Sequence, residues 1–405
     1  MDNRESELNK VLFLSYDGLT DPLGQSQILP YLCGLSFKEY TITIVSFEKE
    51  DRFAKESGRI FELCEKHSLS WRPLKYHSYP PVLSTLYDLF QLRKLAIRLH
   101  RQKQFGIVHC RSYITSLVGL MMKKRFGIKF IFDMRGFWAD ERVEGGLWNL
   151  NNPVFNLVYN YFKKKEKRFL TESDYVISLT ENAKKEILSW KIASAPISII
   201  STCVDLELFD PERVKPDDQA RLREQLGIKA DEFVLLYLGS WGTWYLIDEM
   251  LAFFSVLKKE VKKAKFLIVS PDRVELANYL DKNDVILTQT ARQLVPLYIS
   301  LANASVFFIK PTFSKKASSA TKMGEIVAMN VPFIVNKGWG DVESIVNMGA
   351  SGYYLNDFTD QSFRDSIVWL SGGGFEKNRP LATKLFGLTA GIDRYLGVYR
   401  DLIRF

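Results

Sequence analysis

The sequence lacks the features that mark membrane-spanning, secreted or metal-binding proteins. Its 405 residues contain no apolar run of about 18 residues, the length that a membrane-spanning helix needs. The first seven residues are polar and acidic, which is not the pattern of a signal peptide. The cysteines are far apart and show neither a CxxC motif nor Cys/His metal spacing, so we expect reduced thiols, a cytoplasmic protein and no metal. They are Cys33, Cys64, Cys110 and Cys203.

Other absences exclude classes of function. No G-x-G-x-x-G motif follows the first apolar run, so a nicotinamide dinucleotide site is not expected. No Ser/His/Asp triad is evident, and the four histidines have no metal-ligand spacing. No recognition motif accompanies the basic residues, so we expect no nucleic-acid partner.

Positive charge is concentrated in the first half of the chain. Residues 1–200 hold 30 basic and 22 acidic side chains, which accounts for the whole net charge of +8. Two stretches, Arg93–Lys103 and Lys163–Arg168, interleave basic and apolar residues at helical spacing. They suit a helix on an anionic membrane surface, which would place the protein on the inner face of a membrane. The alternative is a solvated helix face.

Short apolar runs alternate with helix-length segments along the chain. The runs are apolar throughout, which indicates strands buried on both faces of parallel sheets. The pattern restarts after a polar, proline-bearing segment at residues 205–218, which we interpret as a linker. We therefore predict an α/β chain with two doubly wound domains, 1–204 and 205–388, facing each other across a cleft. The last segment, 389–405, is predicted to be a helix that packs back on the first domain.

The most informative stretch lies between two apolar runs in the second half. Residues 318–332 read SSATKMGEIVAMNVP, so a small-residue loop leads into an apolar helix that carries Glu325. Such a loop, at the carboxyl end of a strand, offers backbone N–H groups to phosphate oxygens. Glu325 is then a candidate for binding sugar hydroxyls, and the alternative is a solvated surface carboxylate. Gly239, Ser240 and Gly242 follow another run and allow close backbone approach to a ligand.

Two loops of the first half are further candidates. The first contains Gly18, Gly24, Gln25 and Ser26. Here we expect Ser26 and Gln27 to open a helix whose N–H groups attract an anion, although a plain turn is the alternative. The second reads DMRGFWADE and begins at Asp133, so it gathers Asp133, Arg135 and two further carboxylates. These charges are either catalytic or paired with each other.

Three segments in this order resemble the retaining family 4 glycosyltransferases of the GT-B fold, over essentially the whole chain. They are residues 318–332, the interdomain segment 200–209 and the loop 133–138. The resemblance implies two Rossmann-like domains, a nucleotide-sugar donor in the second and an acceptor on the first. It implies neither a metal nor another cofactor.

The resemblance also assigns roles to single residues. Glu325 would bind the ribose hydroxyls, and Thr288 and Thr290 would border the base. Three loop residues, with Lys322, would face the donor's sugar and diphosphate; they are Ser318, Ser319 and Thr321.

The chain departs from the family's pattern at three places. Ala317 replaces a glutamate that is usual near the donor sugar, and Arg135 stands where a histidine is common. The loop at residues 240–245 lacks the usual Arg and Lys, which leaves Lys310, Lys322 or Arg292 to hold the diphosphate.

The predicted reaction is transfer of a sugar, with retention, to a saccharide acceptor that is lipid-linked. We expect Lys322 to stabilise the leaving phosphates, and Arg135 with Asp133 to act from the first domain. The alternatives are a non-catalytic nucleotide-sugar-binding protein and a sugar-nucleotide epimerase of the same fold. The sequence does not disclose the donor, the acceptor or the linkage.

Overall fold

The chain forms two compact units in the computed structural model, which describes residues 9–38, 40–272, 281–375 and 377–404. Unit 1 runs to Ser201 and resumes at Leu388, and unit 2 spans Thr202–Gly387. The C-terminal helix therefore belongs to unit 1. Residues 205–218, expected as a linker, are part of unit 2, where Phe209 is fully buried.

Unit 1 is built on one parallel sheet with the strand order β3-β2-β1-β4-β5-β6-β7. The central strands β4 and β5 are rich in Val, Ile and Phe and are buried except at Lys129, as expected when helices cover both faces of the sheet. The register places Arg111 opposite Asp133 at the carboxyl ends of neighbouring strands. The strands are β1 (Lys10–Ser15), β2 (Thr41–Glu48), β3 (Ser70–Lys75), β4 (Ile107–Arg111), β5 (Lys129–Asp133), β6 (Tyr175–Ser178) and β7 (Ile197–Ile199).

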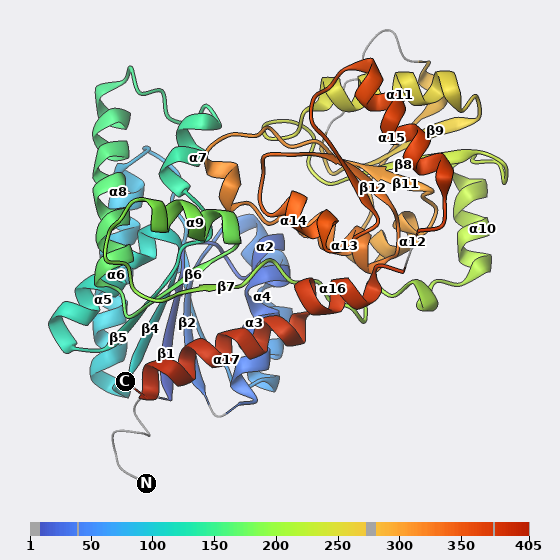
Figure 1. Ribbon diagram of the computed structural model, residues 1–405. Coiled ribbons are helices and arrows are strands. Elements are labelled where there is room, and N and C mark those ends of the chain that lie inside the picture. The colour runs from blue at the N-terminus through green and yellow to red at the C-terminus, as the bar shows by residue number, and fades with distance from the viewer. Residues whose placement is uncertain (1–8, 39, 273–280, 376, 405) are drawn as a thin grey trace. The chain divides into compact units, whose positions relative to one another are not determined.

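Helices cover both faces of this sheet. One face carries α5, α6 and α8, packed against each other in that order, and the other carries α3, α4 and α17 (Figure 1). Helices α5, α6 and α8 each lead into the next strand, so their N-terminal ends lie at the carboxyl edge of the sheet. The helices of unit 1 are α2 (Pro22–Gln27), α3 (Leu29–Ser36), α4 (Glu50–Lys66), α5 (Leu83–Lys103), α6 (Ser112–Phe126), α7 (Trp138–Glu144), α8 (Pro153–Glu172), α9 (Glu181–Ser189) and α17 (Leu388–Arg404).

Unit 2 repeats the plan with a parallel sheet of order β10-β9-β8-β11-β12-β13. Its strands are β8 (Phe233–Leu238), β9 (Ala264–Val269), β10 (Val285–Thr288), β11 (Ala304–Val306), β12 (Phe333–Asn336) and β13 (Gly352–Leu355). Its α-helices are α10 (Pro216–Gln225), α11 (Ile247–Glu260), α12 (Val295–Ile299), α13 (Thr321–Ala328), α14 (Val342–Asn347), α15 (Asp360–Gly372) and α16 (Arg379–Phe386). Short 3-10 turns are η1 (Pro211–Arg213), η2 (Lys282–Asp284), η3 (Arg292–Leu294) and η4 (Ser314–Ala317).

The predicted α/β architecture of two doubly wound sheets is confirmed, but two strands had no signal in the apolar pattern. Both β3 and β13 lie at a sheet edge, where one side of the strand needs no neighbour. In β3 the sequence SWRPLK is mixed, and only Trp71 is fully buried. The apolar run at 306–309 is a strand only at its first residue, because β11 stops at Val306.

Candidate functional site

The donor-type loop and helix of unit 2 are present as predicted. Helix α13 begins at Thr321, directly after the loop, and both Lys322 and Glu325 are buried on it. The two side chains are three residues apart, so they lie on one side of the helix. At the helix start, the first N–H groups have no acceptor within the helix and suit an anion.

Lys322 lies against the loop that follows β8. Its ammonium is 3.7 Å from the ring centre of Tyr245 and 4.3 Å from that of Tyr237, so two aromatic faces hold the charge. A Cβ added to Gly239 would lie 2.8 Å from Lys322 Nζ, so the glycine is needed for this approach. Burial lowers the pKa of Lys322 to about 7, while Glu325 acts in the opposite direction.

The three cations that the sequence left open for the diphosphate differ in their surroundings. Lys310 is exposed, and its backbone N–H donates to the carbonyl of Trp244 in the glycine loop. Arg292 is paired with Glu325. Of the three, Lys322 is the one whose ammonium lies next to Gly239, and its role at the diphosphate stays a prediction.

Glu325 is paired with Arg292 in this structure. Arg292 Nη1 lies 2.8 Å from Glu325 Oε1, and the guanidinium lies 5.2 Å from the ring centre of Phe209. The pair brings the segment after β10, which holds Thr288 and Thr290, to helix α13. The role of these three predicted residues in binding ribose and base stays a prediction.

Two residues of the small-residue loop already form hydrogen bonds within the protein. The Ser318 N–H donates to the carbonyl of Lys315 and closes a 3-10 turn, so it is not directed at a ligand. The Ser319 hydroxyl lies 2.8 Å from that of Thr202, and the two share a hydrogen bond. The amides available for phosphate are consequently those nearer Thr321.

The loop at 239–245 is shaped for close approach. Gly239 and Gly242 have φ values of 115° and 110°, a region that favours glycine. Thr243 has φ of 57°, a strained value for a branched residue. The backbone N–H of Trp241 donates to Asp272 Oδ2 at 2.7 Å, and the carbonyl of Ser240 accepts from the Tyr237 hydroxyl.

A second buried lysine near this loop was not predicted from the sequence. Lys315 is buried, and its ammonium lies 3.6 Å from the ring centre of Trp244. A lysine pair, Lys315 and Lys316, directly before the small-residue loop was the available signal. Its aromatic partner is distant in sequence, so the pattern alone did not distinguish it from a surface lysine.

In unit 1, the first loop differs from the prediction. The carboxylate of Glu48 accepts hydrogen bonds from the N–H groups of Leu19 and Thr20, at 2.8 and 3.0 Å. These two N–H groups are thus bound by the chain's own carboxylate. The prediction that Ser26 and Gln27 open a helix is wrong, since both lie in the last turn of α2, which begins at Pro22.

The glycines of this loop serve packing. A Cβ on Gly24 would lie 2.0 Å from the carbonyl oxygen of Gly18, and one on Gly18 would meet Glu48 at 2.7 Å. Gln25 donates to the carbonyl of Thr20, and the Ser26 hydroxyl donates to that of Pro22. These contacts make Gly18, Gly24, Gln25 and Ser26 parts of a closed turn.

The Asp133 loop gathers the charges that the sequence indicated, and adds a histidine. Asp133 Oδ1 lies 3.7 Å from Arg135 Nη1, and its Oδ2 lies 3.5 Å from His109 Nε2. The hydroxyl of Tyr395, from α17, donates to Asp133 Oδ2 at 3.1 Å. His109 is held on its other side by Tyr399, whose hydroxyl lies 2.8 Å from His109 Nδ1.

Their surroundings keep Asp133 ionised and His109 neutral in this cluster. Burial opposes the charge on Asp133, but Arg135, His109 and Arg111 outweigh it and lower the pKa of Asp133. Burial lowers the pKa of His109, against the pull of Asp133. Asp133 is therefore a buried carboxylate that orients its neighbours, while Arg135, with φ of 58°, is held in a strained conformation at the carboxyl edge.

A second buried cluster corrects one predicted membrane contact. Lys163 lies 2.7 Å from Asp140 Oδ2 and 2.5 Å from Glu166 Oε1, so its charge is used inside unit 1. Arg168 pairs with Glu172 at 2.6 Å. Of the stretch Lys163–Arg168, the exposed cations are Lys164, Lys167 and the paired Arg168.

The described part of the chain shows neither a metal-binding cluster nor a membrane-spanning helix. No group of three or more His, Cys, Asp or Glu side chains there is placed to hold a metal ion. No helix among the same residues is long and apolar enough to cross a membrane.

Comparison with known proteins supports the sequence resemblance. Residues 34–208 match the family model described as Glycosyltransferase Family 4. A D-inositol 3-phosphate glycosyltransferase 2 from Catenulispora acidiphila is 23% identical over 174 residues, which are 42% of this chain and 38% of the relative. The match therefore spans less than two fifths of that relative's length.

Solved structures show the fold. A sucrose-phosphate synthase from Thermosynechococcus elongatus aligns with a TM-score of 0.71 and 15% identity over 98% of this chain and 99% of the other. HepE from Anabaena, in complex with UDP and glucose, aligns with a TM-score of 0.66 and 13% identity over 96% and 99%. The predicted GT-B fold and the resemblance to family 4 glycosyltransferases are confirmed.

Proposed function

We propose that the protein is a glycosyltransferase that moves a sugar from a nucleotide-sugar donor in unit 2 to a saccharide acceptor held by unit 1. The observation that carries the proposal is Lys322, a buried cation against the Gly239 loop and one helical turn from the Glu325 carboxylate. With this spacing, the Lys322 ammonium would bind the diphosphate while the Glu325 carboxylate binds the ribose of the same nucleotide.

The chemistry follows from the charge that develops on the leaving group. Breaking the bond between sugar and diphosphate leaves positive charge on the sugar ring and negative charge on phosphate oxygens. Lys322 and the N–H groups at the start of α13 would stabilise that negative charge, with Lys315 as a second cation. This route requires no metal, and family resemblance supports retention of configuration.

In unit 1 we propose that Arg135 contacts the substrate and that Asp133 positions it. Arg135 keeps little exposure and lies at the carboxyl edge of the sheet, where open α/β sheets bind ligands. The acceptor is a lipid-linked saccharide, and the basic α5 surface would hold the protein at the inner face of a membrane.

A screen of nucleotide sugars by thermal shift tests the donor site, because a ligand bound by the native state raises its melting temperature. We expect one nucleotide sugar to stabilise the protein, and Lys322→Gln to remove most of that shift. Lys262→Gln is the matched control, since Lys262 is an exposed lysine of unit 2 in the turn between α11 and β9. Equal shifts for both variants would refute the assignment.

One observation favours a second function. Ala317 is buried in the turn before the loop and offers no carboxylate where the resemblance places one near the donor sugar. A protein that binds a nucleotide sugar without transferring it is therefore the alternative, with epimerisation as a third outcome. Incubation of the donor with and without acceptor separates the three: transfer, an isomerised donor, or unchanged donor.

A further inference from the structure

A cavity in unit 1 lies apart from the Asp133 cluster and has no role in the chemistry above. Its volume is about 570 Å³, which is within the range of small-molecule sites. Helices α5, α6 and α8 supply most of its walls. The apolar side chains that line it include Leu86, Leu89, Ile114, Leu117, Val158 and Phe162.

The rim of this cavity is apolar and exposed. Leu86 on α5 and Leu157 on α8 both line the cavity, yet they are 55% and 72% exposed. Leu83, Tyr87 and Phe90 extend the exposed surface along α5. Apolar side chains gathered around one opening indicate an interaction site, because scattered single exposures would need no partner.

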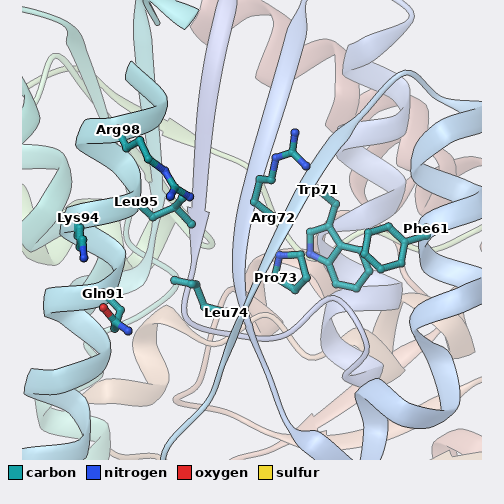
Figure 2. A pocket seen from close by; sticks show the side chains of 9 residues that line it. All are labelled: Phe61, Trp71, Arg72, Pro73, Leu74, Gln91, Lys94, Leu95 and Arg98. Atoms are coloured by element: carbon teal, nitrogen blue, oxygen red, sulfur yellow. The ribbon is translucent and has the colours of Figure 1, made fainter. Parts of the chain in front are cut away.

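Basic side chains flank the apolar rim. Beyond Phe90, α5 continues with exposed Arg93, Lys94 and Arg98. Lys94 and Arg98 line a hollow of about 410 Å³ with Arg72 from the edge strand β3 (Figure 2). The described residues that line this hollow include no acidic side chain, so its charge is available to an anion.

A second basic hollow is lined by α6 and α8. Lys124, Arg125, Lys165 and Arg168 surround it, and Leu117 lines both this hollow and the apolar cavity. Glu172 pairs with Lys124 and Arg168 and so neutralises part of the charge. An apolar opening and two basic hollows on the same helices complement a lipid whose chain is apolar and whose surroundings are anionic.

The cavity also reaches the reaction edge of the sheet. Asp17, after β1, and Ser112, after β4, are among its lining residues. Arg111 lies next to Ser112 in the chain and pairs with Asp17 at 3.3 Å. Arg111 is also the register partner of Asp133. A molecule in the cavity would therefore extend to the carboxyl edge at which Arg135 lies.

We propose that this cavity binds the hydrocarbon chain of a lipid-borne acceptor, with Arg142, which also lines it, facing the anionic head. The proposal rests on the proposed function and specifies its acceptor. The chain enters between Leu86 and Leu157, and the basic hollows contact the headgroups of the surrounding membrane. Each methylene that leaves water favours binding, so a short chain suffices for measurable binding.

Binding of farnesyl phosphate, a short isoprenyl phosphate, tests this directly. Trp138 and Trp148 line the cavity, so their fluorescence reports its occupancy. We expect saturable binding that inorganic phosphate does not displace. The double variant Leu86→Glu, Leu157→Glu should weaken binding by about tenfold or more, because it places charge against the hydrocarbon. Leu117→Trp, which fills the cavity, should do the same.

Matched controls are available in the same unit. Phe37→Glu, in the turn after α3, and Leu188→Glu, on α9, alter side chains that are 70% and 53% exposed, and both variants should bind farnesyl phosphate as the native protein does. Flotation with vesicles of phosphatidylcholine and phosphatidylglycerol should likewise be weaker for the rim variant than for the native protein and the two controls. Equal binding by rim and control variants overturns the proposal, as does a native dimer that the rim substitutions dissociate.

Donor binding separates this proposal from the one it rests on. UDP affinity should be unchanged in every rim variant, because the substitutions lie in unit 1 and Lys322 in unit 2. If a nucleotide sugar binds and is transferred to a soluble saccharide while farnesyl phosphate does not bind, the lipid site is wrong and the transferase function stands. If farnesyl phosphate binds but no nucleotide sugar does, the transferase function fails.

Discussion

At the scale of single residues, Lys322 has the least ordinary environment of the proposed donor site. A lysine on two tyrosine faces with a pKa lowered by burial to about 7 is poised between its charged and neutral forms. A diphosphate favours the charged form, because an opposite charge nearby raises a lysine pKa. Donor binding should therefore take up a proton above neutral pH.

The pH dependence has opposite signs for binding and for folding. Affinity for the donor's nucleoside diphosphate should fall by up to about tenfold per pH unit above 7, since only the charged Lys322 binds well. The free energy of unfolding should gain a contribution from Lys322 as pH rises from about 7 to 10, since the unfolded lysine keeps its proton longer. Calorimetric titration of this diphosphate, as identified by the thermal-shift screen, at several pH values checks the first expectation, and Lys322→Met should abolish its slope. A slope that survives in Lys322→Met contradicts the assignment.

Glu325 gives a second residue-scale prediction. If its carboxylate binds ribose hydroxyls, the native protein should prefer the donor's nucleoside diphosphate over the 2′-deoxy form by about tenfold, the worth of a hydrogen bond to a charged group. Glu325→Ala should bind the two equally. Competition titrations measure the ratio, and an unchanged preference in the variant would place the ribose elsewhere. Arg292→Ala separates the effect of the ion pair from that of the ligand contact.

At the scale of elements, the glycine turn after β1 is explained by packing. Gly24→Ala should destabilise the protein by about 1–3 kcal/mol, because its Cβ would lie 2.0 Å from a backbone oxygen. Gly58→Ala is the control, since a Cβ there meets nothing within 4 Å in the middle of α4. It should stabilise by about 0.5–1 kcal/mol. Urea unfolding distinguishes the two, and similar effects would show that the turn is not tightly packed.

Helix α17 is the other element with a specific prediction. Tyr399 is fully buried and holds His109, so Tyr399→Phe should cost about 1–2 kcal/mol and Tyr399→Ala about 3–5 kcal/mol. Tyr79→Ala, at a side chain 84% exposed, should change stability by less than about 0.5 kcal/mol. Unfolding curves in urea measure all three. A cost for Tyr399→Phe equal to that for Tyr399→Ala would mean that the hydroxyl, and not the ring, stabilises the helix.

At the scale of the whole molecule, strands buried on both faces were predictable from their apolar runs, whereas two of the four edge strands, β3 and β13, were not. Runs such as the FVLLYL of β8 are apolar because both faces are covered, whereas β3 has one open side and a mixed sequence. The donor helix was predictable because its loop and Glu325 are contiguous in sequence. Glu48, His109 and Lys315 were not, because each acquires its partner from a distant segment: Leu19, Asp133 and Trp244.

One measurement tests whether unit 2 activates a nucleotide sugar through Lys322 for transfer to a lipid-borne saccharide. Release of nucleoside diphosphate is followed together with the mass of the acceptor, for the native protein, Lys322→Gln and the control Lys262→Gln. We expect native and control to release one diphosphate for each sugar gained by the acceptor, and Lys322→Gln to be slower by about a hundredfold or more. Release at the native rate in Lys322→Gln would exclude this role of Lys322, and release without any gain in acceptor mass would exclude transfer.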